Sequence, residues 1–179
     1  MAHEKAAVFI DGGYFAKVLK DYFGEARIDY LRLSETLCSG YERFRTYYYN
    51  CMPYQSDPPT DEEKARYQNM QRFVVSLQRM PRFVVRLGRL RKTKDGFEQK
   101  GVDVQLAIDL VELSLTASIQ KAIIIAGDAD YVPPVKKARD SHALVHLYYY
   151  PGTVSMELRD NCDERTEITQ RLIDQVRMP

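Results

Sequence analysis

The sequence predicts a single α/β domain, with a mostly parallel central sheet in a three-layer, Rossmann-like arrangement. Apolar runs typical of buried strands alternate with segments of helical spacing, as a parallel sheet covered on both faces requires. The chain has 179 residues, enough for one compact core. No internal repeat, low-complexity tract or linker interrupts it, so we expect one domain over residues 1–179.

The first part of the chain predicts two strands and two helices. A continuous apolar run that ends at Asp11-Gly12-Gly13 is typical of a buried strand followed by a tight turn. A second segment, rich in aromatic and β-prone residues, predicts another strand. The strands are expected at Ala6–Ile10 and Phe44–Cys51, and the helices at Tyr14–Phe23 and Tyr30–Ser39.

The middle of the chain predicts a loop, a long helix and a hairpin. Three prolines within Met52–Pro59 indicate a loop, and Asp61–Gln78 suits a helix capped by Thr60 or Asp61. Arg82–Lys92 is strand-like. It is followed by the turn signal Asp95-Gly96, so a hairpin is expected to project here.

The second half begins with the clearest helical pattern, at Val102–Ala117. Measured from Asp103 at about 100° per residue, one side of this helix carries four apolar residues that are expected to face the sheet: Leu106, Ala107, Leu110 and Val111. Further strands are expected at Lys121–Ala126 and Ala143–Tyr149, and helices at Tyr131–Asp140, Ser155–Asn161 and Arg171–Val176.

The composition excludes some classes of protein. It does not decide on nucleic-acid binding, which only the distribution of charge can indicate. The chain carries 26 Lys+Arg against 25 Asp+Glu, so its bulk charge of +1 does not indicate a nucleic-acid partner. Three cysteines without a CxxC pair and only three histidines do not predict a zinc site. Reduced cysteines and the lack of a signal-like or membrane-length apolar run predict a cytoplasmic protein with no membrane partner.

Four aspartates follow strands or begin a helix at places that can meet. Asp11 follows the first strand, Asp128 and Asp130 follow the strand Lys121–Ala126, and Asp103 lies in the first turn of the long helix. Ligands of open α/β sheets bind at the carboxyl ends of the strands. We therefore expect these four carboxylates to converge there.

Converging carboxylates predict a divalent metal. Crowded carboxylates repel one another, and Mg²⁺ or Mn²⁺, which prefer oxygen ligands, neutralise them. Each acid also has an ordinary structural explanation: Asp11 can shape a turn, Asp103 can complement the helix dipole, and Asp128 and Asp130 can cap a helix. Their coincidence at one edge of the sheet favours a metal site that activates water against a phosphodiester.

At the same residues the sequence resembles the NYN branch of the PIN-like nuclease superfamily, in particular its LabA-like bacterial members. The motifs are VFIDGGYF (Val8–Phe15), QKGVDVQLAIDL (Gln99–Leu110) and IIIAGDADYVPPV (Ile123–Val135). The resemblance covers nearly the whole chain. It implies a PIN-like fold and an Mg²⁺- or Mn²⁺-dependent endoribonuclease acting on RNA, expected to be single-stranded, or on single-stranded DNA. Related domains also suggest a homodimer.

The resemblance assigns roles residue by residue. It implies metal-binding and catalytic roles for Asp11, Asp103, Asp128 and Asp130. Asp109 also matches the helix motif, but it lies about 120° around the helix from Asp103, so we expect it to support the site or the fold. Lys100 is expected to contact a phosphate or to hold a carboxylate in place.

The sequence departs from the family pattern beside the acids. Tyr14 stands where the family often has Asn, and Ala126 and Ala129 stand where it has Ser. Tyr14 keeps a hydroxyl near Asp11 and, expected to be exposed, is a candidate for stacking on a base, whereas Ala126 loses a hydroxyl. These changes leave open a catalytically weak or inactive PIN-like module that binds RNA or protein.

A basic segment precedes the long helix. Between Arg82 and Lys100 lie seven basic residues and two acids. A basic hairpin beside the acids can hold a phosphate backbone, and an equally good explanation is an edge strand protected from aggregation by its charges. The residues expected to contact phosphates are Arg89, Arg91, Lys92 and Lys100.

Other enzymes with Rossmann-like sheets fit less well. A dinucleotide oxidoreductase needs GxGxxG after the first strand, and DGGYFAK lacks that spacing. A phosphatase with an aspartyl nucleophile needs an acid where Gly13 stands, and a topoisomerase–primase-type nuclease needs a glutamate at the end of the first strand. The tyrosine runs 47–49 and 148–150 are expected to pack in the core.

Overall fold

The computed structural model describes residues 4–94 and 96–179, and in these ranges it confirms the three-layer α/β fold. Seven strands form one sheet in the order β4-β3-β2-β1-β5-β6-β7. All neighbouring pairs are parallel except β3 and β4. The strands are β1 (Lys5–Asp11), β2 (Glu42–Cys51), β3 (Phe83–Thr93), β4 (Gly96–Lys100), β5 (Lys121–Ile125), β6 (Leu144–Tyr149) and β7 (Glu164–Glu167).

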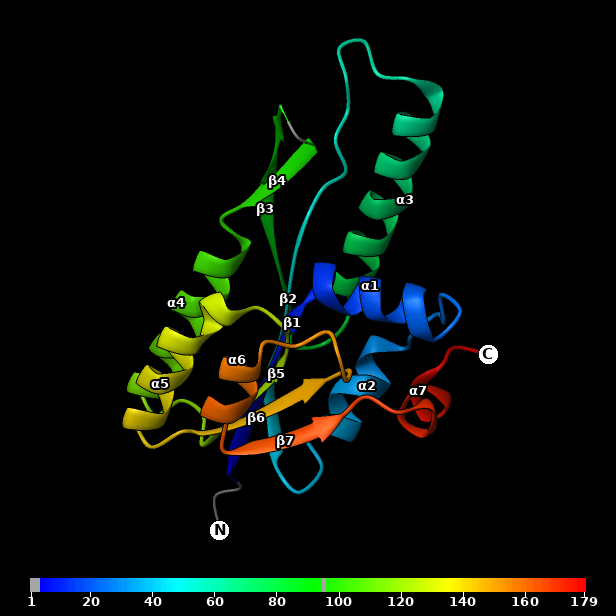
Figure 1. Ribbon diagram of the computed structural model, residues 1–179. Coiled ribbons are helices and arrows are strands. Elements are labelled where there is room, and N and C mark those ends of the chain that lie inside the picture. Colours follow the sequence, from blue (N-terminus) through cyan, green and yellow to red (C-terminus); the bar gives the residue numbers. More distant parts are fainter. Residues whose placement is uncertain (1–3, 95) are drawn as a thin grey trace.

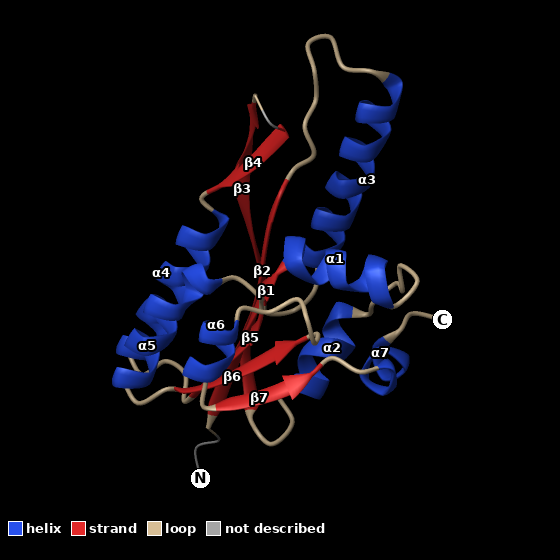
Figure 2. Cartoon of the chain, in the orientation of Figure 1, coloured by secondary structure: helices blue, strands red, loops and turns tan. Residues whose placement is uncertain are grey.

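Helices cover both faces of the sheet (Figures 1 and 2). One buried cluster joins α4, α5 and α6 to the sheet, and a second joins α1, α2, α3 and α7 to the opposite face. No helix in the described ranges is both long and apolar enough to span a membrane. The helices are α1 (Gly12–Tyr22), α2 (Tyr30–Leu37), α3 (Asp61–Gln78), α4 (Val102–Leu115), α5 (Val132–Asp140), α6 (Met156–Asn161) and α7 (Gln170–Val176), with a 3₁₀ turn η1 (Ala129–Tyr131) before α5.

The central strands are apolar throughout because both of their faces are buried. In β1, Ala7 and Phe9 pack under α4 and α5, whereas Ala6, Val8 and Ile10 pack toward α1 and α2. This two-sided burial explains the continuous apolar runs of β1 and β5. It also divides the tyrosines of β2 between the two clusters and confirms that they belong to the core.

Helix α4 faces the sheet with a different side from the one predicted. Leu106 and Leu110 are buried as expected, but Ala107 and Val111 are only partly buried. Asp109, a charged residue, lies on the buried side instead, with 8% of its surface exposed. The prediction placed Asp109 away from the sheet because it is charged. The sequence does not show that Asp109 has a buried partner.

Strands β3 and β4 form the expected hairpin, which projects beyond the sheet (Figure 1). The predicted turn residue Asp95 lies outside the described residues. The loop 52–60 and α3 rise beside the hairpin.

Thr60 caps α3 as predicted, because its hydroxyl accepts from the Glu63 amide while the Glu63 carboxylate accepts from the Thr60 amide. Strand β7 was not predicted, because its sequence Glu164–Glu167 carries no apolar run.

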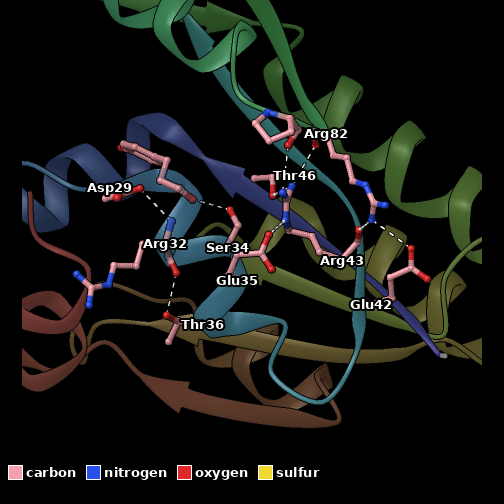
Figure 3. A network of polar contacts seen from close by, with 11 residues as sticks. Asp29, Arg32, Ser34, Glu35, Thr36, Glu42, Arg43, Thr46 and Arg82 are labelled. Atoms are coloured by element: carbon pink, nitrogen blue, oxygen red, sulfur yellow. Dashed lines mark hydrogen bonds and ion pairs between the residues drawn. The ribbon is translucent and has the colours of Figure 1, made fainter.

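At the other end of β2, a buried arginine joins β2 to α2 and to the turn before β3 (Figure 3). Arg43 is 6% exposed; it forms a 2.7 Å ion pair with Glu35 of α2 and donates to the carbonyl of Pro81 at 3.1 Å. Arg82 in turn donates to the Arg43 carbonyl and pairs with Glu42. One of the seven basic residues of the Arg82–Lys100 segment is therefore used to hold the sheet together.

Candidate active site at the carboxyl ends of the strands

Two of the four predicted acids meet through a buried tyrosine. Asp11 is the last residue of β1, Asp103 lies in the first turn of α4, and Tyr131 ends η1. The Tyr131 hydroxyl donates to Asp103 Oδ1 at 2.7 Å and to Asp11 Oδ2 at 3.0 Å. Three segments distant in the sequence thus place two carboxylates around one hydroxyl.

The environment of Tyr131 keeps its hydroxyl protonated. Its side chain is fully buried, and burial raises the pKa of the hydroxyl, with further upward shifts from the charges of Asp11 and Asp103. A tyrosine hydroxyl carries one proton. This single proton lies between two acidic side chains, and a divalent cation would supply positive charge that it does not.

Asp11 combines a structural role with a position suited to chemistry. Its Oδ1 accepts from the Tyr14 amide at 3.0 Å and so caps α1. Burial raises the pKa of Asp11, and the charge of Asp103 raises it further, against the lowering effect of the hydrogen bonds from Tyr14 and Tyr131. A bound cation would oppose this upward shift, because it favours the ionised form of Asp11.

Asp128 and Asp130 are not grouped with this pair among the described residues, so their roles as metal ligands stay predictions. Both are exposed, and Asp128 Oδ1 accepts from the Asp130 amide at 3.0 Å, which caps η1. This local hydrogen bond holds the Asp128 carboxylate on its own loop. Within the described residues, no group of three or more histidines, cysteines or acids is placed to hold a metal.

Asp128 and Asp130 nevertheless follow the strand next to the pair. Strand β5 lies beside β1 with Ile125 opposite Ile10, so the loop that carries Asp128 begins level with Asp11. The donor chemistry of the pair fits Mg²⁺, because that ion is commonly bound by one or two carboxylates and keeps several waters. Asp11 and Asp103 supply such a set.

Asp109 lies apart from the pair and is neutralised. The Arg86 guanidinium donates to both of its carboxylate oxygens at 3.2 Å, and the Tyr49 hydroxyl donates to Oδ2 at 2.8 Å. These contacts tie α4 to β2 and β3. Because its charge is already paired with Arg86, Asp109 is not available to bind a metal.

Tyr14 is not the exposed stacking residue that was expected. It is half-buried, and its hydroxyl accepts from the Tyr150 amide at 3.0 Å and shares a hydrogen bond with Thr153. A Cβ at Gly127 would collide with the Tyr14 ring and lie 2.6 Å from the Thr153 carbonyl oxygen. Tyr14 therefore packs α1 against the loop after β5 and supports the site through its backbone amide.

The basic segment divides into structural and exposed residues. Arg82 and Arg86 are held by Glu42 and Asp109. Arg89 and Lys92 are exposed on the β3–β4 hairpin, where phosphate contact was expected. Arg91 and Lys100 belong to the same hairpin strands, but their side chains fall outside the described part of the molecule.

Sequence reasoning missed Tyr131. It stands inside the quoted motif IIIAGDADYVPPV, directly after Asp130, where a tyrosine is typical of a core residue at the start of a helix. Its ring is indeed in the core, in the cluster under α4 and α5. Only its hydroxyl reaches the acids, and no spacing in the sequence indicates that contact.

The fold and the site together define the class: a Rossmann-like α/β domain with two carboxylates at the carboxyl ends of its parallel strands. The chain belongs to the NYN family, because the NYN domain model matches residues 5–169. The crystal structure of a protein of unknown function from Vibrio parahaemolyticus is similar, with a TM-score of 0.67 at 20% identity over 98% of this chain and 97% of that one. At that identity the likeness shows the fold alone. No curated protein matches the chain.

Proposed function

We propose that the protein is a metal-dependent endoribonuclease that hydrolyses single-stranded RNA with Mg²⁺ or Mn²⁺. The observation that carries the proposal is the Tyr131 hydroxyl shared by Asp11 and Asp103, at 3.0 and 2.7 Å. Two partly buried carboxylates around one proton donor form a site suited to a cation, at the end of the sheet where this class of fold binds ligands.

In this proposal each residue of the site has a defined task. Asp11 and Asp103 hold the ion, which when bound polarises the phosphodiester and makes a water more acidic. Tyr131 orients both carboxylates and keeps its proton. Asp128 and Asp130 are proposed as further ligands; the cap uses Oδ1 of Asp128, and a carboxylate can accept at both oxygens.

The exposed arm, formed by the β3–β4 hairpin and the loop 52–60 beside it, supplies contacts to the substrate. Arg89 and Lys92 on the hairpin, together with Arg91 and Lys100, are proposed to hold the phosphate backbone. The hairpin leads directly into α4, which carries Asp103 in its first turn. Phosphates held on the hairpin would therefore lie next to Asp103, a proposed metal ligand.

Cleavage of a labelled single-stranded RNA tests the proposal. We expect Mn²⁺-dependent cleavage by the wild type and inhibition by EDTA. Asp103→Asn should lose about a hundredfold in rate, because losing even a residue that only orients metal ligands costs about 10- to 100-fold. Asp21→Asn, an exposed acid of α1, is the matched control and should keep full activity. Cleavage of a single-stranded DNA of the same sequence tests whether the enzyme distinguishes RNA from DNA.

A melting curve gives a second readout of the same site. Mn²⁺ should raise the melting temperature of the wild type and of Asp21→Asn, but not that of Asp103→Asn, because an ion bound only by the native state stabilises it. Cleavage that survives both EDTA and Asp103→Asn would contradict the proposal.

A second candidate function is an RNA-binding module that does not cut. It is favoured by the lack, among the residues that the structure describes, of any three-carboxylate group. This candidate predicts RNA binding without cleavage at millimolar Mn²⁺, and equal binding by wild type and Asp103→Asn.

A further inference from the structure

Two aromatic rings meet on the exposed arm, where the proposed function has so far assigned only charge. Tyr54, in the loop after β2, and Phe97, on β4, have ring centroids 4.9 Å apart at an interplanar angle of 43°. Phe97 is 57% exposed, so a face of its ring is accessible to a ligand. The Lys92 ammonium lies 5.6 Å from the centre of the Tyr54 ring.

The position of this pair relates it to the acids. Loop 52–60 continues from the carboxyl end of β2, and β2 pairs with β1, which ends at Asp11. Phe97 precedes Asp103 by six residues, a stretch of chain that spans at most about 20 Å. Figure 1 shows the hairpin rising above the start of α4.

We propose that Tyr54 and Phe97 form a stacking platform for an unpaired base of single-stranded RNA, with Lys92 holding the adjacent phosphate. An exposed ring offers its face to any base, and a cation beside it serves the backbone, which is how proteins bind single strands without reading sequence. This inference rests on the proposed nucleic-acid function. It adds a physical basis for the single-stranded substrate: bases paired in a duplex cannot reach the platform.

Binding of a short RNA, measured in the Asp103→Asn background so that the RNA stays intact, tests the platform. Phe97→Ala should weaken binding of single-stranded RNA roughly 5- to 150-fold, the range for loss of one stacked base. Phe97→Tyr, which keeps the ring, should bind as the parent does, and Phe97→Leu, which keeps apolar bulk, should resemble Phe97→Ala. Duplex RNA should show no difference among these variants.

A scan with a single abasic site identifies the stacked base. In the parent, one abasic position a few nucleotides from the cleaved bond should weaken binding. In Phe97→Ala that penalty should vanish, because ring and base contribute through the same contact. Equal binding by parent and Phe97→Ala, or an abasic penalty that the substitution leaves unchanged, overturns the platform.

The two proposals fail separately. Abasic coupling at Phe97 without cleavage by the wild type would support the platform and reject the nuclease, whereas cleavage without coupling would do the reverse. Tyr54→Leu is a second variant that should lose the same coupling. Because Phe97 is exposed, its substitution should leave the melting temperature unchanged.

A separate observation concerns the outer face of α4. Three large aliphatic side chains are more than half exposed there: Val104 at 61%, Ile108 at 57% and Leu115 at 55%. With Val111 they recur at spacings of four, three and four residues, so they form one stripe along the helix. Pro133 of α5 borders the same groove, which also contains Glu112 and Lys137.

We infer that this stripe is covered by a second copy of the chain, related by a twofold axis. The four–three–four spacing lets two copies of one helix interdigitate along a seam. The rim carries an acid on α4 and a base on α5, so a twofold pairing can place Glu112 of each copy near Lys137 of the other. A contiguous exposed apolar surface of this kind is typical of an interface.

The mass in solution, measured by light scattering across a concentration series, tests the dimer. The wild type should have twice the chain mass and Ile108→Glu the mass of one chain. Met156→Glu, at another exposed apolar side chain, 65% exposed on α6, should remain a dimer. A monomeric wild type, or a dimeric Ile108→Glu, overturns the inference.

Charge reversal distinguishes a second copy from any other partner. Glu112→Lys and Lys137→Glu should each be weakened as homodimers, since each brings like charges together at both ends of the interface. An equimolar mixture of the two should recover the dimer mass, because both contacts then join opposite charges. No recovery in the mixture would overturn the twofold pairing.

Discussion

At the scale of single residues, the site depends on Tyr131. Its hydroxyl contacts both Asp11 and Asp103, and its hydrogen bond lowers the pKa of Asp11 against the larger upward effect of burial. In the absence of a cation, the raised pKa has a cost. Ionisation of Asp11 removes stability as the pH rises from the ordinary value of 3.8 through the raised pKa, and a bound ion reverses this loss.

We predict that Tyr131→Phe weakens metal affinity about 10- to 100-fold, the range for loss of a residue that orients metal ligands. Because the lost hydrogen bond had lowered the pKa of Asp11, that pKa should rise further. The acid limb of the pH–rate profile should therefore move to higher pH, and calorimetry with Mn²⁺ should show the weaker binding. Tyr22→Phe, an exposed tyrosine of α1, is the control. An unchanged acid limb would separate Tyr131 from the site.

At the scale of elements, α4 is held on the sheet by a charge pair as well as by apolar packing. Asp109 accepts from Tyr49 of β2 and pairs with Arg86 of β3, so the helix that carries Asp103 is fixed to two strands. The Asp109 side chain is 11% exposed and that of Arg86 45%. Water therefore screens the arginine side of the pair, and the cost of breaking it is smaller than for a fully buried pair.

We predict that Arg86→Ala lowers the free energy of unfolding by about 1–3 kcal/mol, because it leaves a buried carboxylate with a single neutral donor. Asp109→Asn should cost less, since its amide oxygen can still accept from Tyr49. Urea denaturation measures both. The double variant should lose less than the sum of the two, and strict additivity would show that the residues do not interact.

At the scale of the whole molecule, the net charge is near zero, but residues of different roles lie in different parts of the structure. Asp11 lies at the carboxyl end of β1, and the Arg43 network lies at the opposite end of β2. The exposed Arg89, Lys92 and Phe97 lie on the β3–β4 hairpin, which projects beyond the sheet (Figure 1). Membership of the NYN family places the chain among PIN-like nucleases. The RNA substrate, the ion and the pairing of chains are the proposals made above.

The sequence by itself determined the order of strands and helices, the burial of both faces of β1 and β5, and the placement of Asp11, Asp103, Asp128 and Asp130 at one end of the sheet. These features follow from local periodicity and from the direction of the chain, which a sequence displays. Strand β7 was not predicted, because an edge strand needs no apolar run.

The tertiary structure alone decided which carboxylates meet. It joined Asp11 to Asp103 through Tyr131, held Asp128 on its own loop, neutralised Asp109 with Arg86 and folded Tyr14 over Gly127. Each outcome depends on a donor that is distant in the chain or on a competing backbone amide. Periodicity predicts the face on which a side chain lies. The hydrogen bond that it makes depends on which partner the packed core brings beside it.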